Sequence, residues 1–472
     1  MSNTEKKQLI ILGAGPGGYA AAFRAADLGI KVTLIGEEQN PGGVCLYRGC
    51  IPSKALLHVS KMKQDAEGFG KMGLGFKSPK IDLKQINSWK TGIVEKLTGG
   101  LGELAKAHKI EYLQGKAKFL SEKEIEFTDS DGKTESLHFD NLILATGSTP
   151  ISLPKVEMDG KNIISSKEAL NMEKIPDSLL VIGGGYIGLE LGSVYAHLGS
   201  KVSIAEMWDG FLPGADRDLV EVFTAANPDL FEATHFNTTV ESATTKSGKV
   251  MVLMKNSEGK QEKTFEQVLL AIGRKPNSEI LQLEKAGIDV EDKGFVKVNE
   301  KQQTHIKHIY AIGDLVGEPM LAHKATKQGR IAAEVISGDA GAAYDARAIP
   351  AVVFTNPEIA WCGLTETEAK NADKKVKVAK FPWSASGRAL TMGLDKGLTK
   401  LIIDPKTGRI LGGGAAGKDV SSLIPEIVLA IEMGATAEDL SLTIHPHPTL
   451  SETVMEAAEM FLGSPTHLFR QK

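Results

Sequence analysis

Two stretches of the chain repeat the same order of apolar, glycine-rich and helical segments. The first, near the N-terminus, reads LIILGAGPGGYAAAFRAADLGIKVTLIG, and the second, over residues 179–206, reads LLVIGGGYIGLELGSVYAHLGSKVSIAE. A short continuous apolar run is typical of a strand buried on both faces, and the alanine- or leucine-rich segment after each glycine cluster is typical of a helix. The pattern predicts two strand–turn–helix–strand units, each belonging to a doubly wound parallel sheet.

Two later apolar runs end in a glycine turn and mark the expected exits from these units. They are LILATGSTP at 142–150 and VLLAIGRKPN at 268–277. The segment HIYAIGD precedes an expected helix over about 320–336. From about residue 349 the pattern changes to alternating strands such as KLIID, followed by a last helix expected around 448–461. We therefore predict an α/β protein of four units, the last of them α+β: residues 1–149, 150–276, 277–348 and 349–472.

Length and composition exclude several classes of protein. The chain has 472 residues, 42% of them hydrophobic and 24% charged, which is ordinary for a globular protein of about three domains. The net charge of -4 provides no basic field for nucleic acid or an anionic membrane. No apolar run of ~18 residues and no export signal is visible, and three cysteines are too few for a disulfide framework. We expect a cytoplasmic protein with no nucleic-acid or membrane partner.

The first glycine cluster fits a dinucleotide-binding turn. Gly13, Gly15 and Gly18 have the spacing G-x-G-x-x-G directly after one predicted strand and before a helix, where backbone N–H groups can meet a pyrophosphate. An ordinary glycine-rich turn is the plainer alternative. An acid should end the second strand and bind a ribose diol, but Gly36 stands there and Glu37 follows. The acid is therefore displaced by one position or absent.

The second glycine cluster has the acid that the first lacks. Gly183, Gly185 and Gly188 repeat the spacing, and the second strand ends at Glu206. A carboxylate at this position accepts hydrogen bonds from a free ribose 2′-hydroxyl and repels a 2′-phosphate, so it favours NAD over NADP. The alternative is that Glu206 only caps a surface turn.

Two cysteines five residues apart are the strongest candidates for reactive side chains in the chain. Cys45 and Cys50 lie in GGVCLYRGCIPSK, and residues at that spacing on a regular helix rise about 7.5 Å, more than the ~6.8 Å that a disulfide usually spans. A bond between them requires a distorted turn, for which Gly49 and Pro52 are suitable residues. A metal site would need at least two more ligands, and two inert buried thiols are the other alternative.

The tail carries a histidine-rich segment before its expected helix. In HPHPTLSE, an imidazole that acts as a base needs an anionic partner to orient it, and Glu452 is the nearest carboxylate. The segment alone does not choose between His445 and His447. Thr449 and Glu452 also have the spacing of a capping box, so Glu452 could serve only to fasten the helix start.

Taken in order, these motifs resemble those of a known family over nearly the whole chain. GGVCLYRGCIPSK, the two glycine turns, ATG, AIGRKPN, YAIGD and HPHPTLSE are similar to the class I FAD-containing pyridine nucleotide disulfide oxidoreductases, and within them to the branch that oxidises dihydrolipoamide. Two positions depart from the family pattern. Members commonly have an acid where Gly36 stands and Asn-Val where Tyr47 and Arg48 stand.

The resemblance implies roles for the four units and for single residues. The units would be, in order, an FAD-binding domain with a redox disulfide, an NAD-binding domain, a central domain that completes the FAD site, and a dimerisation domain with the catalytic histidine. The implied catalytic residues are Cys45, Cys50, His447, Glu452, Lys54 and Glu190. The implied FAD- and NAD-binding residues, together with positions expected from the turns, are Gly13, Gly15, Gly18, Glu37, Lys54, Gly115, Thr146, Gly147, Gly183, Gly185, Gly188, Glu206, Gly273, Arg274, Asp314, Met320, Ala322 and His323; no metal is expected.

Three of these roles have plainer alternatives. Lys54 and Glu190 would form a buried pair beside the flavin, or only a surface ion pair. Asp314 would bind the ribityl chain of FAD, or only cap a helix. Tyr186 stands where some relatives place an aromatic ring over the flavin, but core packing explains it equally well.

The implied reaction moves electrons from a dithiol to NAD through FAD. By resemblance, His447 deprotonates dihydrolipoyl-lysine, the thiolate attacks Cys45, and Cys50 passes the electron pair to the flavin and so to NAD. The tail of one subunit would complete the site of the other in a homodimer. No lipoyl segment precedes the first strand, so the partner would be a lipoyl-bearing acyltransferase of a 2-oxo acid dehydrogenase complex or the lipoyl carrier of the glycine cleavage system. The alternatives are a reductase of another disulfide or a metal ion, and an inactive dinucleotide-binding scaffold.

Overall fold

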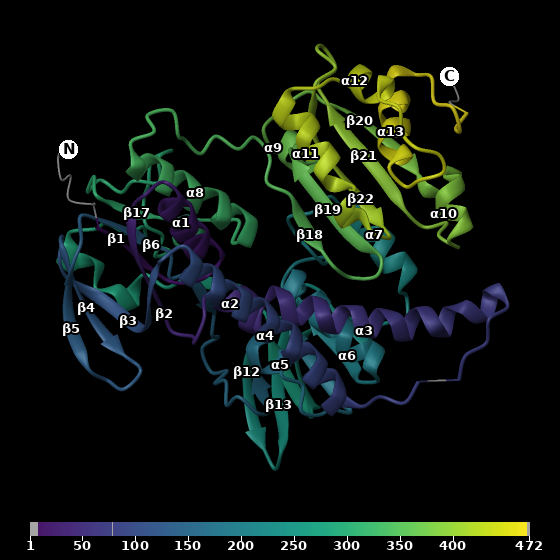
Figure 1. The fold of residues 1–472 in the computed structure, drawn as a ribbon. Coiled ribbons are helices and arrows are strands. Elements are labelled where there is room, and N and C mark those ends of the chain that lie inside the picture. Colours follow the sequence, from purple (N-terminus) through teal and green to yellow (C-terminus); the bar gives the residue numbers. More distant parts are fainter. Residues whose placement is uncertain (1–7, 78, 470–472) are drawn as a thin grey trace.

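The first unit is built on a seven-stranded sheet whose central strands are parallel. The computed structural model describes residues 8–77 and 79–469. The sheet order is β17-β6-β1-β2-β3-β4-β5, parallel from β17 to β3 and antiparallel from β3 to β5. Helices α1 and α8 pack together on this sheet (Figure 1). The bounds are β1 Gln8–Leu12, α1 Pro16–Asp27, β2 Lys31–Gly36, β3 Glu111–Ser121, β4 Glu124–Asp129, β5 Thr134–His138, β6 Asn141–Leu144, β17 Ile309–Ala311 and α8 Ala322–Ser337.

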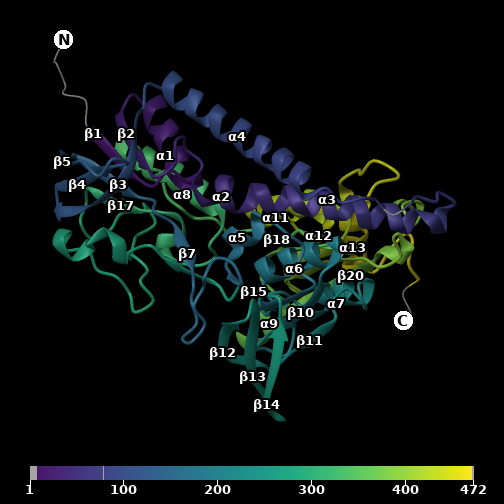
Figure 2. The same ribbon diagram turned by 90° about the horizontal axis from the view of Figure 1, so that it is seen from below.

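The second unit repeats this architecture with a five-stranded parallel sheet. Its order is β11-β10-β9-β15-β8, and a separate antiparallel sheet, β12-β13-β14, extends from it (Figure 2). The two predicted strand–turn–helix–strand units are therefore confirmed. The bounds are α5 Ser166–Leu170, β8 Ile163–Ile164, β9 Ser178–Ile182, α6 Tyr186–Leu198, β10 Lys201–Ala205, α7 Arg217–Ala226, β11 Ala233–His235, β12 Thr239–Lys246, β13 Lys249–Asn256, β14 Gly259–Phe265 and β15 Gln267–Leu270.

The two predicted exits from these units lie side by side. Strands β7 (Ser148–Pro150) and β16 (Arg274–Pro276) pair antiparallel, with Arg274 opposite Pro150 and Pro276 opposite Ser148. Because β17 then joins the first sheet next to β6, the chain returns to the unit in which it began. Residues from three distant segments thus meet at the C-terminal edge of the first parallel sheet.

The third sheet is antiparallel and carries the C-terminal helices. Its order is β18-β19-β22-β21-β20, with α11 and α13 packed against it. The last helix begins at Glu452, after the position expected from the pattern, and ends at Leu462. The bounds are β18 Ala351–Val353, β19 Glu358–Gly363, α9 Glu366–Asn371, β20 Lys377–Pro382, α10 Gly387–Thr391, β21 Leu398–Ile403, β22 Ile410–Gly417, α11 Ile424–Met433, α12 Ala437–Leu442 and α13 Glu452–Leu462.

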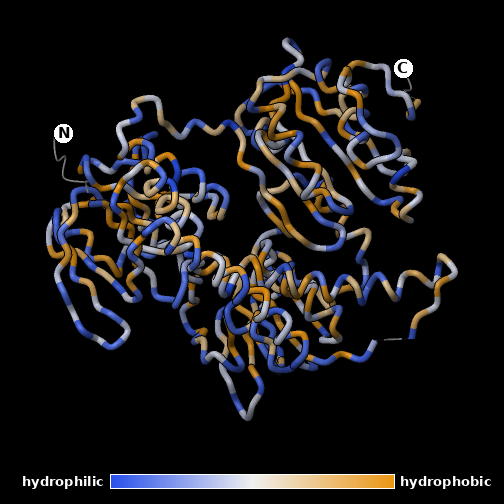
Figure 3. Tube along the Cα trace, in the orientation of Figure 1, coloured by the Kyte–Doolittle hydropathy of each residue, from blue (hydrophilic) through white to orange (hydrophobic). Residues whose placement is uncertain are grey.

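Apolar residues concentrate on the strands inside each unit, and polar residues are frequent in the loops (Figure 3). Strand β1, for example, is buried over Leu9–Leu12. The long helix α3 (Cys50–Gly68) packs against α6 and against α4 (Leu83–Ala107), so it links the first two units. Among the described residues, no helix is both long enough and apolar enough to cross a membrane.

A fully buried lysine joins the second unit to the C-terminal unit, residues 349–472. Lys400 on β21 is 0% exposed, and its Nζ lies 2.9 Å from Asp216 Oδ2 and 3.0 Å from Asp218 Oδ1, with Glu366 as a third partner. These three carboxylates lie close enough together to hold a metal ion, but the ammonium group of Lys400 lies among them. Asp216 also accepts hydrogen bonds from the backbone N–H groups of Glu366 and Thr367. The cluster is an ion pair network at the junction of the two units.

We expect Lys400→Met to lower the free energy of unfolding by about 3–5 kcal/mol, because it leaves buried carboxylates without their cation. Lys380→Met is the matched control. Lys380 contacts Asp218 and Glu366 as well, but its side chain is 42% exposed, so its loss should cost less than about 1 kcal/mol. Urea denaturation of the two variants measures the difference, and equal midpoints would contradict this account.

Candidate functional site

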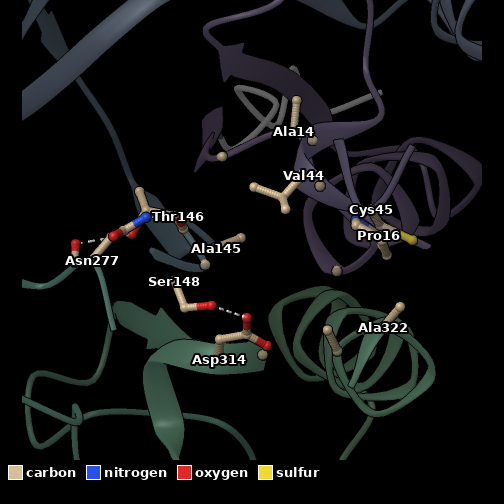
Figure 4. A pocket seen from close by; sticks show the side chains of 18 of the residues that line it. Ala14, Pro16, Val44, Cys45, Ala145, Thr146, Ser148, Asn277, Asp314 and Ala322 are labelled. Carbon is tan, nitrogen blue, oxygen red and sulfur yellow. Dashed lines mark hydrogen bonds between the residues drawn. The ribbon is translucent and has the colours of Figure 1, made fainter. Parts of the chain in front are cut away.

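One cavity connects the first glycine turn with the cysteine pair. Its volume is ≈ 350 Å³, within the ~300–1,000 Å³ typical of cofactor sites. Figure 4 shows side chains from the loops after β1 and β6, from α2 (Gly43–Arg48) and from the start of α8 converging on it. Of the residues predicted from sequence, those that line it are Gly13, Gly15, Glu37, Cys45, Cys50, Lys54, Gly115, Thr146, Gly147, Tyr186, Glu190, Arg274, Asp314, Met320 and Ala322.

The glycine turn leaves the start of α1 open to this cavity. Gly15 is the N-cap of α1, with no side-chain cap and no acid in the first turn, so the N–H groups there are suited to bind an anion. Gly13 has a φ of +106°, and a Cβ on it would lie 2.2 Å from the carbonyl oxygen of Ala145. A Cβ on Gly18 would lie 1.8 Å from the Gly13 carbonyl oxygen, so Gly18 serves the packing of the turn. The turn fits a dinucleotide pyrophosphate.

The cysteine pair lies on the distorted turn that its spacing required. Helix α2 ends at Arg48, and α3 begins at Cys50. Gly49 between them has φ −146° and ψ −114°, and a Cβ there would lie 2.8 Å from the Val44 carbonyl oxygen. Pro52 does not interrupt the helix, because it lies in the first turn of α3, where proline is tolerated. The break therefore comes from Gly49 alone.

The two thiols interact and differ in acidity. Both cysteines are free in this structure. The hydrogen bond between the side chains raises the pKa of Cys45, together with burial. The same bond, with help from the Lys54 ammonium group, lowers the pKa of Cys50 to about 7 against the opposing effect of burial. Cys50 is therefore the thiolate of the reduced pair, at the N-terminus of α3, where the helix dipole favours an anion.

Lys54 and Glu190 form the predicted pair. Lys54 Nζ lies 2.8 Å from Glu190 Oε2 and 3.1 Å from Oε1, and Glu190 is only 3% exposed. The backbone N–H of Phe354 donates to Glu190 Oε1 at 3.0 Å, and the Phe354 ring lies under the lysine at 4.6 Å. The plainer alternative of a surface ion pair is wrong, because the carboxylate is buried. The pair holds a cation one helical turn after Cys50.

A polar chain crosses the middle of the cavity. Ser148 donates to Asp314 Oδ2 at 2.5 Å (Figure 4). It also accepts from Arg274 Nε at 2.8 Å. Nearby, Asn277 Nδ2 donates to the Thr146 carbonyl at 2.9 Å. Asp314 lies within a four-residue 3₁₀ turn and caps no longer helix. Sequence reasoning missed Ser148 and Asn277, because each acts through a partner more than 120 residues away in the chain.

The second glycine turn has its acid in place. Glu206 is 6% exposed, and its carboxylate accepts from the backbone N–H of Gly184 at 2.5 Å and of Trp208 at 2.9 Å. Gly185 is the N-cap of α6 and again has no side-chain cap. Glu206 thus stabilises the turn, while each of its oxygens keeps a lone pair for a ligand. Tyr186, the first residue of α6, is 41% exposed and lines the cavity with the cysteines.

The tail histidine forms its expected pair. His447 Nδ1 lies 2.9 Å from Glu452 Oε1, and Glu452 Oε2 accepts from the Thr449 N–H at 2.7 Å. Burial raises the pKa of Glu452, but the hydrogen bonds from Thr449 and His447 outweigh it and hold that pKa below its ordinary value. The Thr449 hydroxyl bonds to Pro446 and Ser451, so the full capping box is absent at this point. Glu452 both orients His447 and fastens the loop, one oxygen for each.

The structure does not bring all the predicted residues together in one chain. His447 is 73% exposed on the C-terminal unit, whereas the cavity is lined by residues up to Ala325. His445 is paired with Glu426 at 2.7 Å and its side chain is 5% exposed, so His447 is the accessible imidazole of the two. His323, predicted to bind a cofactor, is not among the residues that line this cavity, and its Nε2 lies 2.9 Å from the carbonyl oxygen of Pro350. Gly183, Gly185, Gly188, Glu206 and Gly273 belong to the second unit, outside this cavity.

Comparison with known proteins agrees with this geometry. Residues 7–329 match the model of the pyridine nucleotide-disulphide oxidoreductases, and residues 349–458 match the dimerisation domain of that family. Dihydrolipoyl dehydrogenases from Haemophilus influenzae and Vibrio cholerae are each 46% identical, over 99% of this chain and 98% of theirs. The crystal structure of LpdA from Mycobacterium tuberculosis superposes with a TM-score of 0.89 at 27% identity, over 96% of this chain and 99% of that one. The chain belongs to the pyridine nucleotide-disulphide oxidoreductase family.

Proposed function

We propose that the protein is a dihydrolipoyl dehydrogenase that oxidises protein-bound dihydrolipoamide and reduces NAD. The observation that carries this proposal is that one cavity brings together a dinucleotide-type glycine turn, a cysteine pair in which one thiol has a lowered pKa, and a lysine paired with a buried carboxylate. Relatives of that name match the chain from end to end. An inactive scaffold would have no need of a thiol whose pKa is lowered to about 7.

The reaction has two halves that balance in atoms and electrons. In the first, two substrate thiols and the Cys45–Cys50 disulfide become lipoamide and two enzyme thiols. In the second, the enzyme dithiol and NAD⁺ become the disulfide, NADH and a proton. FAD, when bound, supplies the redox centre between the two halves.

The chain's own residues prepare the sulfur chemistry. His447 accepts the proton of the attacking substrate thiol while Glu452 keeps its ring oriented. Cys45 receives the attack and leaves Cys50 as the thiolate, which the Lys54 ammonium group stabilises. Glu190 forms an ion pair with Lys54 and accepts a hydrogen bond from the backbone N–H of Phe354, and so holds the lysine in place. Asp314, fixed by Ser148, offers a carboxylate to the sugar-alcohol chain of FAD.

The nicotinamide cofactor of this reaction is NAD. We expect Glu206→Gln to reduce the preference for NAD over NADP at least tenfold, because the neutral amide no longer repels a 2′-phosphate. Its one oxygen can accept from only one of the two N–H groups, of Gly184 and Trp208, from which the carboxylate accepts. Steady-state kcat/KM with the two cofactors measures this ratio. Asp209→Asn, which removes a carboxylate three residues further along, should leave the ratio unchanged, and an equal effect of both changes would argue against a direct role.

The partners follow from the dimerisation domain and the substrate. The matched domain supports a homodimer, in which the exposed His447 of each subunit faces the cavity of the other. The lipoyl group would be delivered by an acyltransferase of a 2-oxo acid dehydrogenase complex or by a glycine cleavage carrier. The low cysteine content favours the reducing cytoplasm.

One assay tests the function directly. Purified protein is mixed with dihydrolipoamide and NAD under anaerobic conditions, and NADH formation is followed by absorbance. Oxidised glutathione with NADPH, and Hg²⁺ with NADPH, serve as the competing substrates. Turnover of either competitor, without NADH formation from dihydrolipoamide, would overturn the proposal.

A further inference from the structure

The residue at the end of β2 differs in kind from the residue at the corresponding end of β10. Aligned on their glycine turns, Gly36 occupies the position of Glu206, and Ala14 that of Gly184. A Cβ on Gly36 would lie 2.6 Å from Ala14 Cβ and 2.6 Å from the hydroxyl oxygen of Tyr112. No side chain fits at position 36 while Tyr112 stays in place, so the ribose-binding acid of the second unit has no direct counterpart in the first.

The loop after β2 is held so that a different acid faces the cavity. The Tyr112 hydroxyl donates to the backbone carbonyl of Glu38 at 2.7 Å. Burial, with smaller effects of Tyr47 and Glu38, raises the pKa of Tyr112, so its hydroxyl remains a donor. The Tyr47 hydroxyl donates to the Asn40 carbonyl at 3.0 Å and lies 3.3 Å from the Asn40 N–H. The backbone from Glu38 to Asn40 is therefore fixed by two tyrosines.

The side chain of Glu38 is fixed as well. Its Oε1 accepts from Arg48 Nη1, and both side chains, 31% and 32% exposed, line the same cavity as the glycine turn. Glu37 also lines the cavity, but its side chain is 57% exposed and its Oε2 lies 3.5 Å from Nζ of the exposed Lys116. The two positions that depart from the family pattern after Cys45, Tyr47 and Arg48, thus both hold the loop that carries Glu38.

We propose that Glu38, oriented by Arg48, is the acid that binds the ribose hydroxyls in the adenosine half of FAD, in place of an acid at position 36. This inference rests on the proposed function, since it presumes that FAD occupies the cavity. It replaces the predicted Glu37 in this role. An oriented, partly buried carboxylate forms a stronger hydrogen bond to a hydroxyl than a solvated one does. Arg48 acts as a positioning residue, and its ion pair leaves the second carboxylate oxygen available to the sugar.

The test measures flavin binding rather than turnover. Holoprotein is equilibrated by dialysis against FAD, or against an FAD whose adenosine sugar lacks the 2′-hydroxyl, and bound flavin is read from fluorescence. We expect Glu38→Gln to weaken FAD binding at least about tenfold, and the 2′-deoxy cofactor to bind the wild type more weakly by a similar factor. The two losses should not add, because both remove the same contact. Full additivity would overturn the inference.

Matched variants separate this contact from a merely structural role. Glu37→Gln should leave FAD binding within about twofold. Arg48→Met should weaken FAD binding and reduce the penalty for the 2′-deoxy cofactor, and Arg48→Lys should restore part of both. Should Glu38→Gln fail to fold, the 2′-deoxy cofactor on wild type and on Glu37→Gln still decides between the two acids. A protein that binds no flavin would refute the proposed function itself, whereas unchanged FAD binding by Glu38→Gln would refute only this inference.

Discussion

In the Cys50→Ser variant, dithiol-dependent NADH formation is expected to fall by at least about a thousandfold, because without the Cys45–Cys50 disulfide the enzyme has no group that accepts electrons from the substrate thiols. The variant should also lose a second property. Anaerobic reduction of the wild type by two electrons should give a long-wavelength band from charge transfer between the Cys50 thiolate and the flavin. Cys50→Ser should not show this band, and its survival would move the flavin-facing role to Cys45.

The pH dependence of that band follows from the lowered pKa of Cys50. The hydrogen bond from Cys45 and the charge of Lys54 lower this pKa to about 7, so the thiolate is present above that pH and is protonated below it. The band of the reduced wild-type protein should therefore fade as the pH decreases through about 7. Cys362→Ser is the control, since this third thiol, on β19, is 1% exposed and burial raises its pKa to about 12. The charge-transfer band of this variant should have the same pH dependence as that of the wild type.

His447→Gln is the second change with a large expected effect. Loss of the base should lower kcat with dihydrolipoamide by about 10²–10⁴-fold, while oxidation of NADH by an artificial electron acceptor, which needs no thiol deprotonation, should persist. Because His447 is 73% exposed on its own subunit and Glu452 is its partner, the imidazole is available to a neighbouring molecule. A loss of both activities together would indicate a folding defect instead of a missing base.

Mixed dimers can show which subunit supplies the base. When subunits carrying His447→Gln are randomly mixed with subunits carrying Cys50→Ser, half of the dimers should contain one of each. If the base acts across the interface, each mixed dimer has one complete site, and the mixture should regain about a quarter of wild-type activity. If the base acts within its own subunit, every site lacks one group and the mixture stays inactive. Size-exclusion chromatography of the mixture verifies that dimers have formed.

Much of the fold could be predicted because its signals are local in the chain. Gly13 and Gly183 each have a positive φ, and a Cβ on either would overlap a backbone oxygen. Only glycine fits there, so the spacing of glycines after an apolar strand predicts the turn. The break between Cys45 and Cys50 was likewise predictable, since a bond at that spacing needs a distorted helix and Gly49 permits one. The start of the last helix was placed too early, because the segment after His447 continues as a loop up to Ser451.

The sequence by itself thus determined the two nucleotide units, the spacing of Cys45 and Cys50 and the closeness of a tail histidine to Glu452, because each depends on residues a few positions apart. The tertiary structure chose His447 over His445, which is paired with Glu426. The tertiary structure alone decided which distant side chains contact one another: Ser148 with Asp314 and Arg274, and Lys400 with Asp216. It also decided that Tyr112 occupies the space beside Gly36 and that Arg48 holds Glu38. These contacts join residues between 10 and 184 positions apart. They depend on how sheets and loops pack, which no periodicity or spacing along the chain encodes.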